Sequence, residues 1–332
     1  MKIAITSDNY LRKKDEYPER WNALKDIVKQ NEDLGVDILV IAGDLFDKDY
    51  VNYSEIDSII ENSKLKNCYI IPGNHDSQIS QRHFASNKII AVAETTLKII
   101  DDRQILFVPF LEGKKIGDEI IQFEQLDKNK WVLISHGDFL DTGYSPNAYE
   151  KGIYMPITRS DIQLFSPGRV ILGHIHIPSS LEKKVVYCGS PCAINISETG
   201  YRRFLILDTT NLNLIEREIC TDVLYFREEI IVLPFENEEE YLMNEISRVT
   251  SNWLIKECDI EKSKIIIKVF GVTADKIKVG EFITSGFKKY EWLNSTGPDL
   301  SEISLCEETD KMYIAKEFLE EIKAMELPKI TY

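Results

Sequence analysis

Short apolar runs that end at a polar residue recur through the first two thirds of the chain. Five of them end at side chains able to bind a metal, within residues 2–8, 40–47, 70–76, 131–136 and 170–176. Apolar runs of this length predict buried strands, and open α/β sheets hold their functional groups where the strands end. The pattern therefore predicts several strand ends that meet at one functional site.

Segments of helical period alternate with the first of these runs. Apolar residues repeat at helical spacing between Pro18 and Gly35, and again over residues 56–60. A strand–helix–strand order predicts parallel pairing at the start of the chain. Further strands are predicted within 95–109, 130–135, 168–172, 184–188, 203–208 and 212–219, and a short helix at 117–124. The expected fold of residues 1–222 is α/β, with two packed sheets flanked by helices.

The pattern changes after residue 222. Strands near 224–233 and 264–270 and around 290–292, with helices near 236–250 and 273–283, predict a small α+β capping domain at 223–298. The Gly-Pro pair at 297–298 marks a linker. Beyond it, residues 299–332 contain an amphipathic helix, which either folds back on its own domain or docks on a partner.

Composition narrows the class of protein. The 332 residues carry 40 Lys and Arg against 55 Asp and Glu, a net charge of −15, which argues against a free-standing DNA-binding module. It does not exclude a nuclease whose partner supplies most phosphate contacts. No apolar run has the length of a membrane span, and the first residues read as a strand and not as a signal peptide. The six cysteines lack CxxC spacing, so we expect reduced thiols in a soluble cytoplasmic protein.

The residue types at the strand ends favour a metal site. Alternate residues of an extended chain face the same way, so His174 and His176 can reach one site while Ile175 points into the core. A His-x-His pair alone is more often two hydrogen-bonded histidines, but here it coincides with four other strand-end motifs. The candidate metal ligands are Asp8, Asp44, Asn74, His136, His174 and His176.

These motifs, in this order, resemble the calcineurin-like metallophosphoesterases. Within that superfamily, residues 43–47 and 187–191 resemble the SbcD-type subunit of the DNA double-strand-break repair nuclease, a group that includes phage recombination nuclease subunits. The motifs cover about residues 1–210. The resemblance implies a sandwich of two sheets flanked by helices, followed by a capping domain that helps to select DNA.

The resemblance also implies a centre of two divalent ions. It places Asp8 and His176 on the first ion, Asn74, His136 and His174 on the second, and Asp44 between them. Imidazole and carboxylate ligands favour manganese over magnesium. His75 becomes the catalytic residue, which stabilises the phosphorus or protonates the leaving oxygen. Asp47 and Asp76 either orient ligands or serve only in loop hydrogen bonds.

One position departs from the family. Where the family has Asp-x-His at the end of the first strand, this chain has Asp8-Asn9-Tyr10. Strand alternation aims Tyr10 at the first ion, but a phenol has a pKa near 10 and coordinates poorly unless a metal ionises it. Tyr10 is thus an uncertain ligand, and the first ion site is expected to be weak.

Three functions remain open from the sequence. The first is a DNA exonuclease and endonuclease subunit that acts with an SbcC-type coiled-coil ATPase, bound through residues 309–327, as a homodimer within the complex. The second is a phosphatase or cyclic-nucleotide phosphodiesterase for small substrates, and the third is a scaffold subunit with a weakened metal site. The C-terminal domain and helix favour the first, since a minimal phosphatase needs neither. The cytoplasm, of the host for a phage protein, is the expected compartment.

Overall fold

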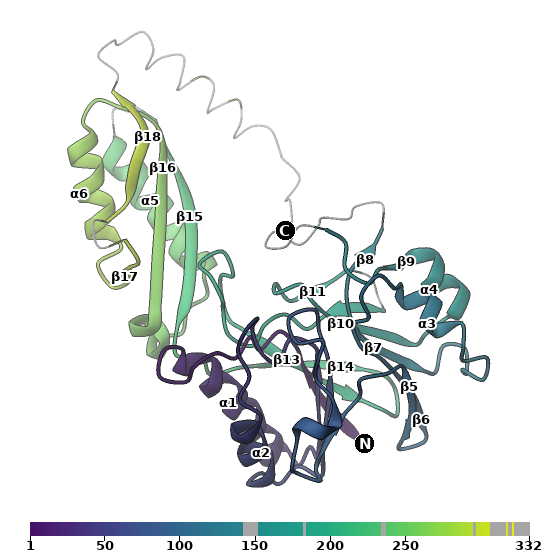
Figure 1. The fold of residues 1–332 in the computed structure, drawn as a ribbon. Helices are drawn as coiled ribbons and strands as arrows, with labels where there is room; N and C mark the ends of the chain where they lie inside the picture. Colours follow the sequence, from purple (N-terminus) through teal and green to yellow (C-terminus); the bar gives the residue numbers. More distant parts are fainter. Residues whose placement is uncertain are drawn as a thin grey trace. The chain divides into compact units, whose positions relative to one another are not determined.

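The computed structural model describes residues 1–141, 152–181, 184–233, 237–294 and 297–305, together with Glu317 and Glu321 alone. The chain forms two compact units (Figure 1). The first contains Met1–Ile194 and Tyr201–Asp222, and the second contains Asn195–Gly200 and the residues from Val223 onward.

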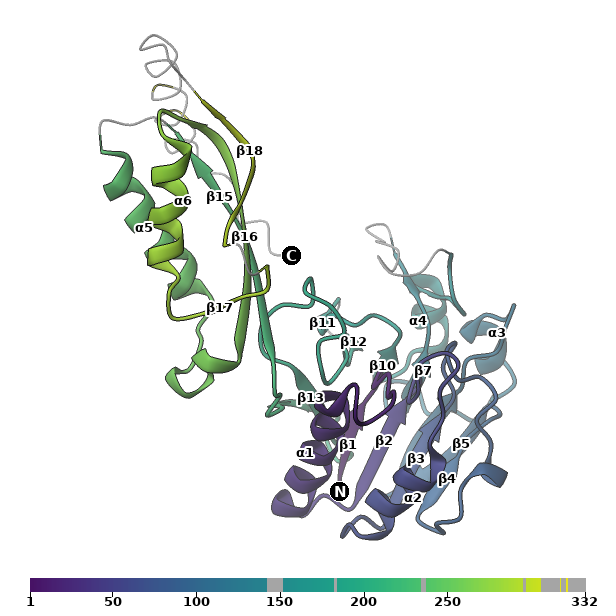
Figure 2. The same ribbon diagram turned by 60° about the vertical axis from the view of Figure 1, so that its left-hand side comes forward.

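The first sheet of the first unit has six strands, in the order β14-β13-β1-β2-β3-β4. They are β1 (Lys2–Thr6), β2 (Ile38–Ala42), β3 (Asn67–Ile71), β4 (Ile89–Ala91), β13 (Arg203–Asp208) and β14 (Leu214–Glu218). Strands β1 to β4 run parallel, as expected from the strand–helix alternation. Helices α1 (Pro18–Leu34) and α2 (Tyr53–Glu61) pack on one face through an apolar cluster (Figure 2). As predicted, α1 begins at Pro18 and is terminated by Gly35, which follows Leu34 and has a left-handed φ of 63°.

The second sheet also has six strands, in the order β11-β12-β10-β7-β6-β5. They are β5 (Thr96–Ile100), β6 (Arg103–Val108), β7 (Val132–His136), β10 (Arg169–Gly173), β11 (Ser179–Ser180) and β12 (Val185–Tyr187). The four central strands run parallel. Helices α3 (Ile116–Ile120) and α4 (Arg159–Phe165) pack on its outer face. Shorter elements are the 3₁₀ helix η1 (Gln81–His83) and the pair β8 (Phe139–Leu140) and β9 (Ile157–Thr158).

The main core lies between the two sheets. Ile3, Val40 and Ile71 of the first sheet share one buried cluster with Phe107 and Ile134 of the second. Because both faces of each sheet are covered, the central strands are apolar at every position and not only at alternate ones. Strand β2, Ile-Leu-Val-Ile-Ala, is buried throughout. The predicted α/β architecture of two packed sheets flanked by helices is confirmed.

The second unit is one sheet with two helices on the same face (Figure 1). Its strands are β15 (Leu224–Val232), β16 (Ser263–Thr273), β17 (Glu291–Trp292) and β18 (Asp299–Leu305). Its helices are α5 (Glu238–Asn252), α6 (Lys276–Gly286) and the 3₁₀ helix η2 (Glu257–Lys262). Burial alternates along β15 and β16, because the described residues cover only one face of this sheet. The Trp253 ring lies 5.6 Å from that of Phe287 and 4.9 Å from that of Phe226.

The predicted boundary at residue 298 differs from the structure. Residues 299–305 form β18, which pairs in parallel with β16 and so belongs to the sheet of the second unit. This strand was missed because only Ile303 among its residues is buried, and the Gly-Pro pair before it reads as a linker. The predicted partner helix at 309–327 lies outside the described residues. Among the helices that are described, none is long and apolar enough to cross a membrane.

Candidate metal centre

The five apolar runs identified in the sequence are β1, β2, β3, β7 and β10. The side chains that follow or end these strands meet at the carboxyl ends of the two sheets. Ligand atoms of Asp8, Asp44 and His136 all lie within 4.8 Å of one another, and the three residues are buried. Parallel pairing explains the convergence, because it carries strand ends that are far apart in sequence to the same edge.

One half of the centre is formed by Asn74, His136 and His174. The His136 Nε2 atom lies 2.9 Å from Asn74 Oδ1 and 3.3 Å from Asp44 Oδ2, and His174 Nδ1 lies 3.2 Å from Asn74 Oδ1. Ligands about 2.1 Å from one octahedral ion lie about 3 Å from each other. His136 Nδ1 pairs with the Ala42 carbonyl at 2.9 Å, which directs Nε2 inward. These residues fit a divalent ion.

The other half is formed by Asp8, Tyr10 and His176. The Tyr10 hydroxyl donates to Asp44 Oδ2 at 2.8 Å and lies 3.1 Å from His176 Nε2. The Tyr10 residue is only 3% exposed. Tyr10 therefore reaches the presumed ligands of the first ion, as predicted, and its hydroxyl links Asp44 to His176. Strand alternation is not the reason, because β1 ends at Thr6 and both Asp8 and Tyr10 have positive φ.

The backbone of the centre adopts unusual conformations. Asp8, Tyr10, Asp44 and His174 all have positive φ, at 53°, 47°, 50° and 95°. Such conformations are unfavourable for residues other than glycine and persist only where surrounding contacts fix them. Here the Asp8 amide donates to the Gly43 carbonyl at 3.0 Å, and the Tyr10 amide donates to the Asp44 carbonyl at 3.1 Å. Strain at the strand ends thus turns these side chains toward one another.

Two glycines are required by close packing against the candidate ligands. A Cβ atom on Gly43 would lie 2.1 Å from His136 Nδ1, and one on Gly73 would lie 2.1 Å from Asp44 Oδ1. No side chain can occupy either position without displacing a ligand. Gly43 and Gly73, which directly precede Asp44 and Asn74, are therefore part of the centre.

The buried charges influence each other strongly. Burial raises the pKa of Asp8. Burial acts in the same direction on Asp44, but the nearby His136 outweighs it and holds the pKa of Asp44 below its usual range. Burial lowers the pKa of His136, yet the Asp44 charge raises it to about 10. These opposite shifts are those expected of a carboxylate and an imidazole buried side by side.

His75 is placed by Asp44 and Asp47. Its backbone amide donates to Asp44 Oδ1 at 2.9 Å, and its Nδ1 lies 3.2 Å from Asp47 Oδ1. The other oxygen of Asp47 accepts from Arg12 Nε at 2.7 Å. Burial raises the pKa of Asp47, but hydrogen bonds from His75, Lys48 and Arg12 lower it to about 2. Asp47 therefore contacts the ring of His75, the residue predicted to be catalytic, and which of its two predicted roles applies stays a prediction.

Asp76 joins two of the ligand loops. One carboxylate oxygen accepts from the Phe46 amide at 3.0 Å, and the other accepts from the Gly73 amide at 2.8 Å. Burial and the neighbouring Asp44 charge raise the pKa of Asp76 to about 7. Asp76 thus joins the loops that carry Asp44 and Asn74 through hydrogen bonds to their backbones, and the choice between its two predicted roles stays open.

Two further residues support the histidine loops and were missed in the sequence. Asp138 Oδ1 lies 3.7 Å from His174 Nε2, and its other oxygen accepts from the Tyr154 amide at 2.6 Å. The sequence does contain a sign of this role, because Asp138 follows His136 by two residues, just as His176 follows His174. Arg202 is buried and donates to the His176 carbonyl and, at 2.9 Å, to the Ser190 carbonyl. No sequence pattern marks Arg202, because its partners lie 12 and 26 residues away.

Comparison with known proteins identifies the family. The sequence model of the calcineurin-like phosphoesterase family matches residues 1–178 of this chain. The chain belongs to this family. Its members are hydrolases of phosphate esters that use divalent metals, so the superfamily prediction is confirmed and the cluster of Asp8, Asp44 and His136 agrees with it.

Individual relatives are more distant. A probable cyclic nucleotide phosphodiesterase of Fibrobacter succinogenes is 28% identical over 167 residues, covering 46% of this chain and 63% of that protein, so this chain spans less than two thirds of it. A solved archaeal phosphodiesterase is 17% identical, with a TM-score of 0.36 over 66% of this chain and 99% of its own. A phosphopantetheinyl hydrolase from Mycobacterium tuberculosis is 14% identical, with a TM-score of 0.38 over 57% and 90%.

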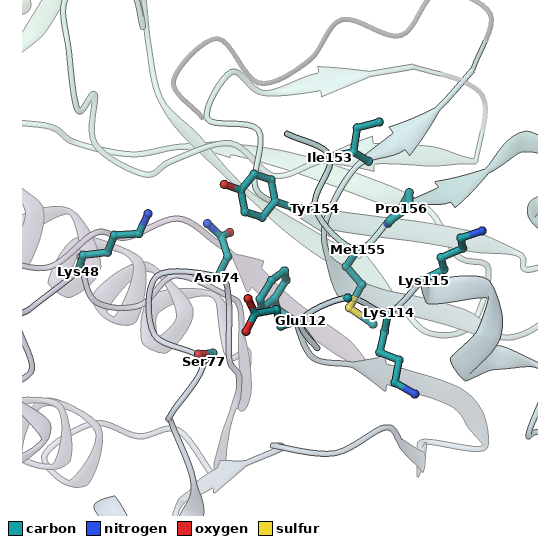
Figure 3. Close-up of a pocket in the computed structure, with 12 residues that line it drawn as sticks. Lys48, Asn74, Ser77, Glu112, Lys114, Lys115, Ile153, Tyr154, Met155 and Pro156 are labelled. Carbon is teal, nitrogen blue, oxygen red and sulfur yellow. The ribbon is translucent and has the colours of Figure 1, made fainter. Parts of the chain in front are cut away.

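A cleft adjoins the half of the centre that contains Asn74. Its volume is about 550 Å³, and its lining comes from four segments of the chain, one of which contains Asn74 (Figure 3). The Tyr154 ring, which also lines the cleft, lies 5.0 Å from the ring of His174. A molecule in this cleft would therefore touch residues of the centre.

Proposed function

We propose that this protein is a manganese-dependent DNA exonuclease and endonuclease subunit, which processes DNA ends in recombination and repair. The observation that carries the phosphodiesterase part is the meeting of the candidate ligands around Asp44, next to a histidine oriented by a second carboxylate. DNA as the substrate is supported by the SbcD-like motifs at 43–47 and 187–191 and by the α+β unit that follows the family domain.

The chain's own residues account for distinct parts of the reaction. When bound, two divalent ions supply Lewis-acid stabilisation of the phosphoryl oxygens and activation of water. Asp44 contacts both halves of the centre and suits the bridging position. With its Nδ1 held by Asp47, His75 can present Nε2 to the substrate and protonate the leaving oxygen. Manganese is proposed because the ligands combine carboxylate, amide and imidazole.

A cyclic-nucleotide phosphodiesterase is the second candidate, because the Fibrobacter relative bears that name. The two candidates separate in one set of assays with manganese. End-labelled single-stranded and duplex DNA, a 3′,5′-cyclic nucleotide and bis-p-nitrophenyl phosphate are offered to the same preparation. We expect cleavage of DNA and of the nitrophenyl ester, with the cyclic nucleotide hydrolysed at least tenfold more slowly. Rapid hydrolysis of the cyclic nucleotide without DNA cleavage would overturn the DNA assignment.

A disabled scaffold is the third candidate, and Tyr10 is the residue that favours it. The other presumed ligands are all present and converge, which argues for a working centre. If the full-length protein, saturated with manganese, hydrolyses none of the four substrates with or without its ATPase partner, the scaffold role becomes the better description.

We further propose that the protein acts in the cytoplasm with an SbcC-type coiled-coil ATPase, as a homodimer within that complex. Residues 309–327 are the proposed docking segment. The support is an apolar stripe at helical spacing in the sequence, at Ala315, Phe318, Leu319, Ile322 and Met325. Deletion of 309–332 should abolish co-purification with the ATPase while leaving the melting temperature of the protein unchanged. A large fall in melting temperature would assign the helix to the protein's own core.

A further inference from the structure

We propose that the cleft beside Asn74 is a subsite for a nucleic-acid strand, which holds the nucleotides that flank the scissile phosphate. This inference rests on the proposed function, since it assigns residues to the substrate of the same centre. We expect the cleft to bind a polyanionic strand with flat bases in preference to a mononucleotide.

The first reason is the position of the cleft. It is lined by the loops after β2, β3 and β6 and by the segment before β9. The loop after β3 contributes Asn74, whose Oδ1 atom lies 2.9 Å from His136 Nε2. A strand in the cleft would therefore run directly into the half of the centre formed by Asn74, His136 and His174.

The second reason is the charge of the lining. Among the described residues that line the cleft, three are lysines, Lys48, Lys114 and Lys115, against a single carboxylate, Glu112. The whole chain has a net charge of −15, so this local excess of positive charge is opposite to the overall balance. Lysines of this kind neutralise phosphates and release counterions from nucleic acid.

The third reason is the pair of aromatic rings in the lining. The rings of Phe110 and Tyr154 lie 6.2 Å apart and are tilted by 42°. Met155 adds a thioether beside them (Figure 3). Proteins that bind single strands combine a positive groove with aromatic side chains on which bases stack, because every base offers a π-face.

The arrangement of the lysines favours a strand over a mononucleotide. Figure 3 shows Lys48 on the same side of the cleft as Asn74, whereas Lys114 and Lys115 lie on the opposite side, beyond Met155. A mononucleotide with its phosphate at the centre would leave the far lysines without an anion. A strand that continues through the cleft would bring further phosphates to Lys114 and Lys115.

The test compares two double variants of the full-length protein. The first is Lys114→Ser with Lys115→Ser, both exposed in the structure. The control is Lys128→Ser with Lys130→Ser, which removes the same charge from exposed positions of the same unit. These control lysines precede β7 and so lie near its amino end, away from His136 at its carboxyl end.

Two readouts are used. Anisotropy of a labelled single-stranded oligonucleotide, measured without divalent metal, reports binding independently of cleavage. We expect the cleft variant to bind at least fivefold more weakly than the control. The slope of log affinity against log salt should fall by about 0.7 for each phosphate that the variant no longer neutralises. With manganese, kcat/KM for the oligonucleotide should fall at least fivefold more than kcat/KM for bis-p-nitrophenyl phosphate.

Equal affinity and salt slope in the cleft variant, the control and the parent would overturn the inference, even if the parent cleaves DNA. Conversely, a parent that binds the strand through Lys114 and Lys115 but does not cleave it would support the subsite and overturn the proposed nuclease activity. Phe110→Leu keeps an apolar side chain but removes the π-face. It should weaken binding and reduce the quenching of 2-aminopurine in the strand, whereas unchanged quenching would contradict base stacking at this position.

Discussion

The two halves of the metal centre share Asp44 but present different chemistry to an ion. On one side, His136 Nε2 lies 2.9 Å from Asn74 Oδ1 and 3.3 Å from Asp44 Oδ2. On the other side, the Tyr10 hydroxyl already donates to Asp44 at 2.8 Å and lies 3.1 Å from His176. Side chains of the centre contact one another in both halves, but the group next to Asp44 is an imidazole nitrogen in the half with Asn74 and a phenol hydroxyl in the half with His176.

The difference arises from one side chain and not from the scaffold. Both halves contain residues with a left-handed backbone near strand ends. These are Asp8 and Tyr10 in one half, His174 in the other, and Asp44, which the halves share. Close-packed glycines precede Asp44, Asn74 and His174, at Gly43, Gly73 and Gly173. Both halves thus rest on the same kind of backbone, and the phenol of Tyr10 distinguishes one half from the other.

The largest effect is expected from the residue common to both halves. Asp44→Ala should remove binding of both ions and lower phosphodiesterase activity on the order of 10⁴-fold, as for a member of a catalytic unit. Metal analysis after gel filtration and hydrolysis of bis-p-nitrophenyl phosphate measure the two effects. Asp37→Ala, at a surface pair with Lys66, is the matched control. Two ions still bound in Asp44→Ala would show that the halves do not share this carboxylate.

A second test separates catalysis from metal binding in either half. His75→Ala should lower activity by about 10²- to 10⁴-fold while both halves keep their metal affinity, because His75 contacts Asp44 through its backbone amide, which alanine retains. Asp47→Asn should have a smaller effect in the same direction, since it orients the ring of His75. His83→Ala, which alters the remaining histidine, is the control and should match the parent. Parent-level activity in His75→Ala would remove this histidine from the mechanism.

Much of the metal centre could be predicted from the sequence. Strand-end ligands are visible there because an apolar run precedes each of them, and parallel pairing brings Asp8, Asp44 and Asn74 to one edge. His136 and His174 follow in the same way from the second sheet. The convergence of these side chains needs no information beyond strand direction.

The supporting contacts could not be predicted. Asp47 meets His75 across 28 residues, and Tyr10 meets Asp44 across 34 and His176 across 166. Such pairs depend on loop conformations, and loops carry no periodicity that fixes where a side chain points. The fold of the second unit shows the same limit, since β18 buries only Ile303 and gives no apolar run.

A third test concerns protons and sharpens the contrast between the halves. Without metal, the pKa of His136 near 10 means that its imidazole is protonated at pH 8. A metal ion binds the neutral ring, so binding at the site that contains His136 should release about one proton. The metal affinity of this site should rise about tenfold per pH unit up to pH 10 and then level off. Manganese titration calorimetry in two buffers of different ionisation enthalpy measures the release. No proton release at pH 8 would mean that His136 is already neutral, or is not a ligand.

The smallest effect is expected from substitution of Tyr10. It tests why the two halves of the centre should differ in metal affinity. We expect the parent to bind one manganese ion well, through Asp44, Asn74 and the histidines of that half, and a second ion weakly. Tyr10→His should tighten the weak site by about tenfold, because an imidazole adds a ligand next to His176. Calorimetry gives both affinities, and activity at low manganese should rise in parallel.

Tyr10→Phe distinguishes a missing ligand from a blocking hydroxyl. Phenylalanine keeps the ring, which packs edge-on against His75 at 4.6 Å, but removes the hydrogen bond to Asp44. If the weak site lacks only a ligand, Tyr10→Phe should resemble the parent, and only Tyr10→His should gain affinity. If both variants tighten the site equally, the hydroxyl competes with the ion for Asp44, and the hydrogen bond itself keeps this half closed to metal. Two equally tight sites in the parent would contradict both accounts and make Tyr10 a full ligand.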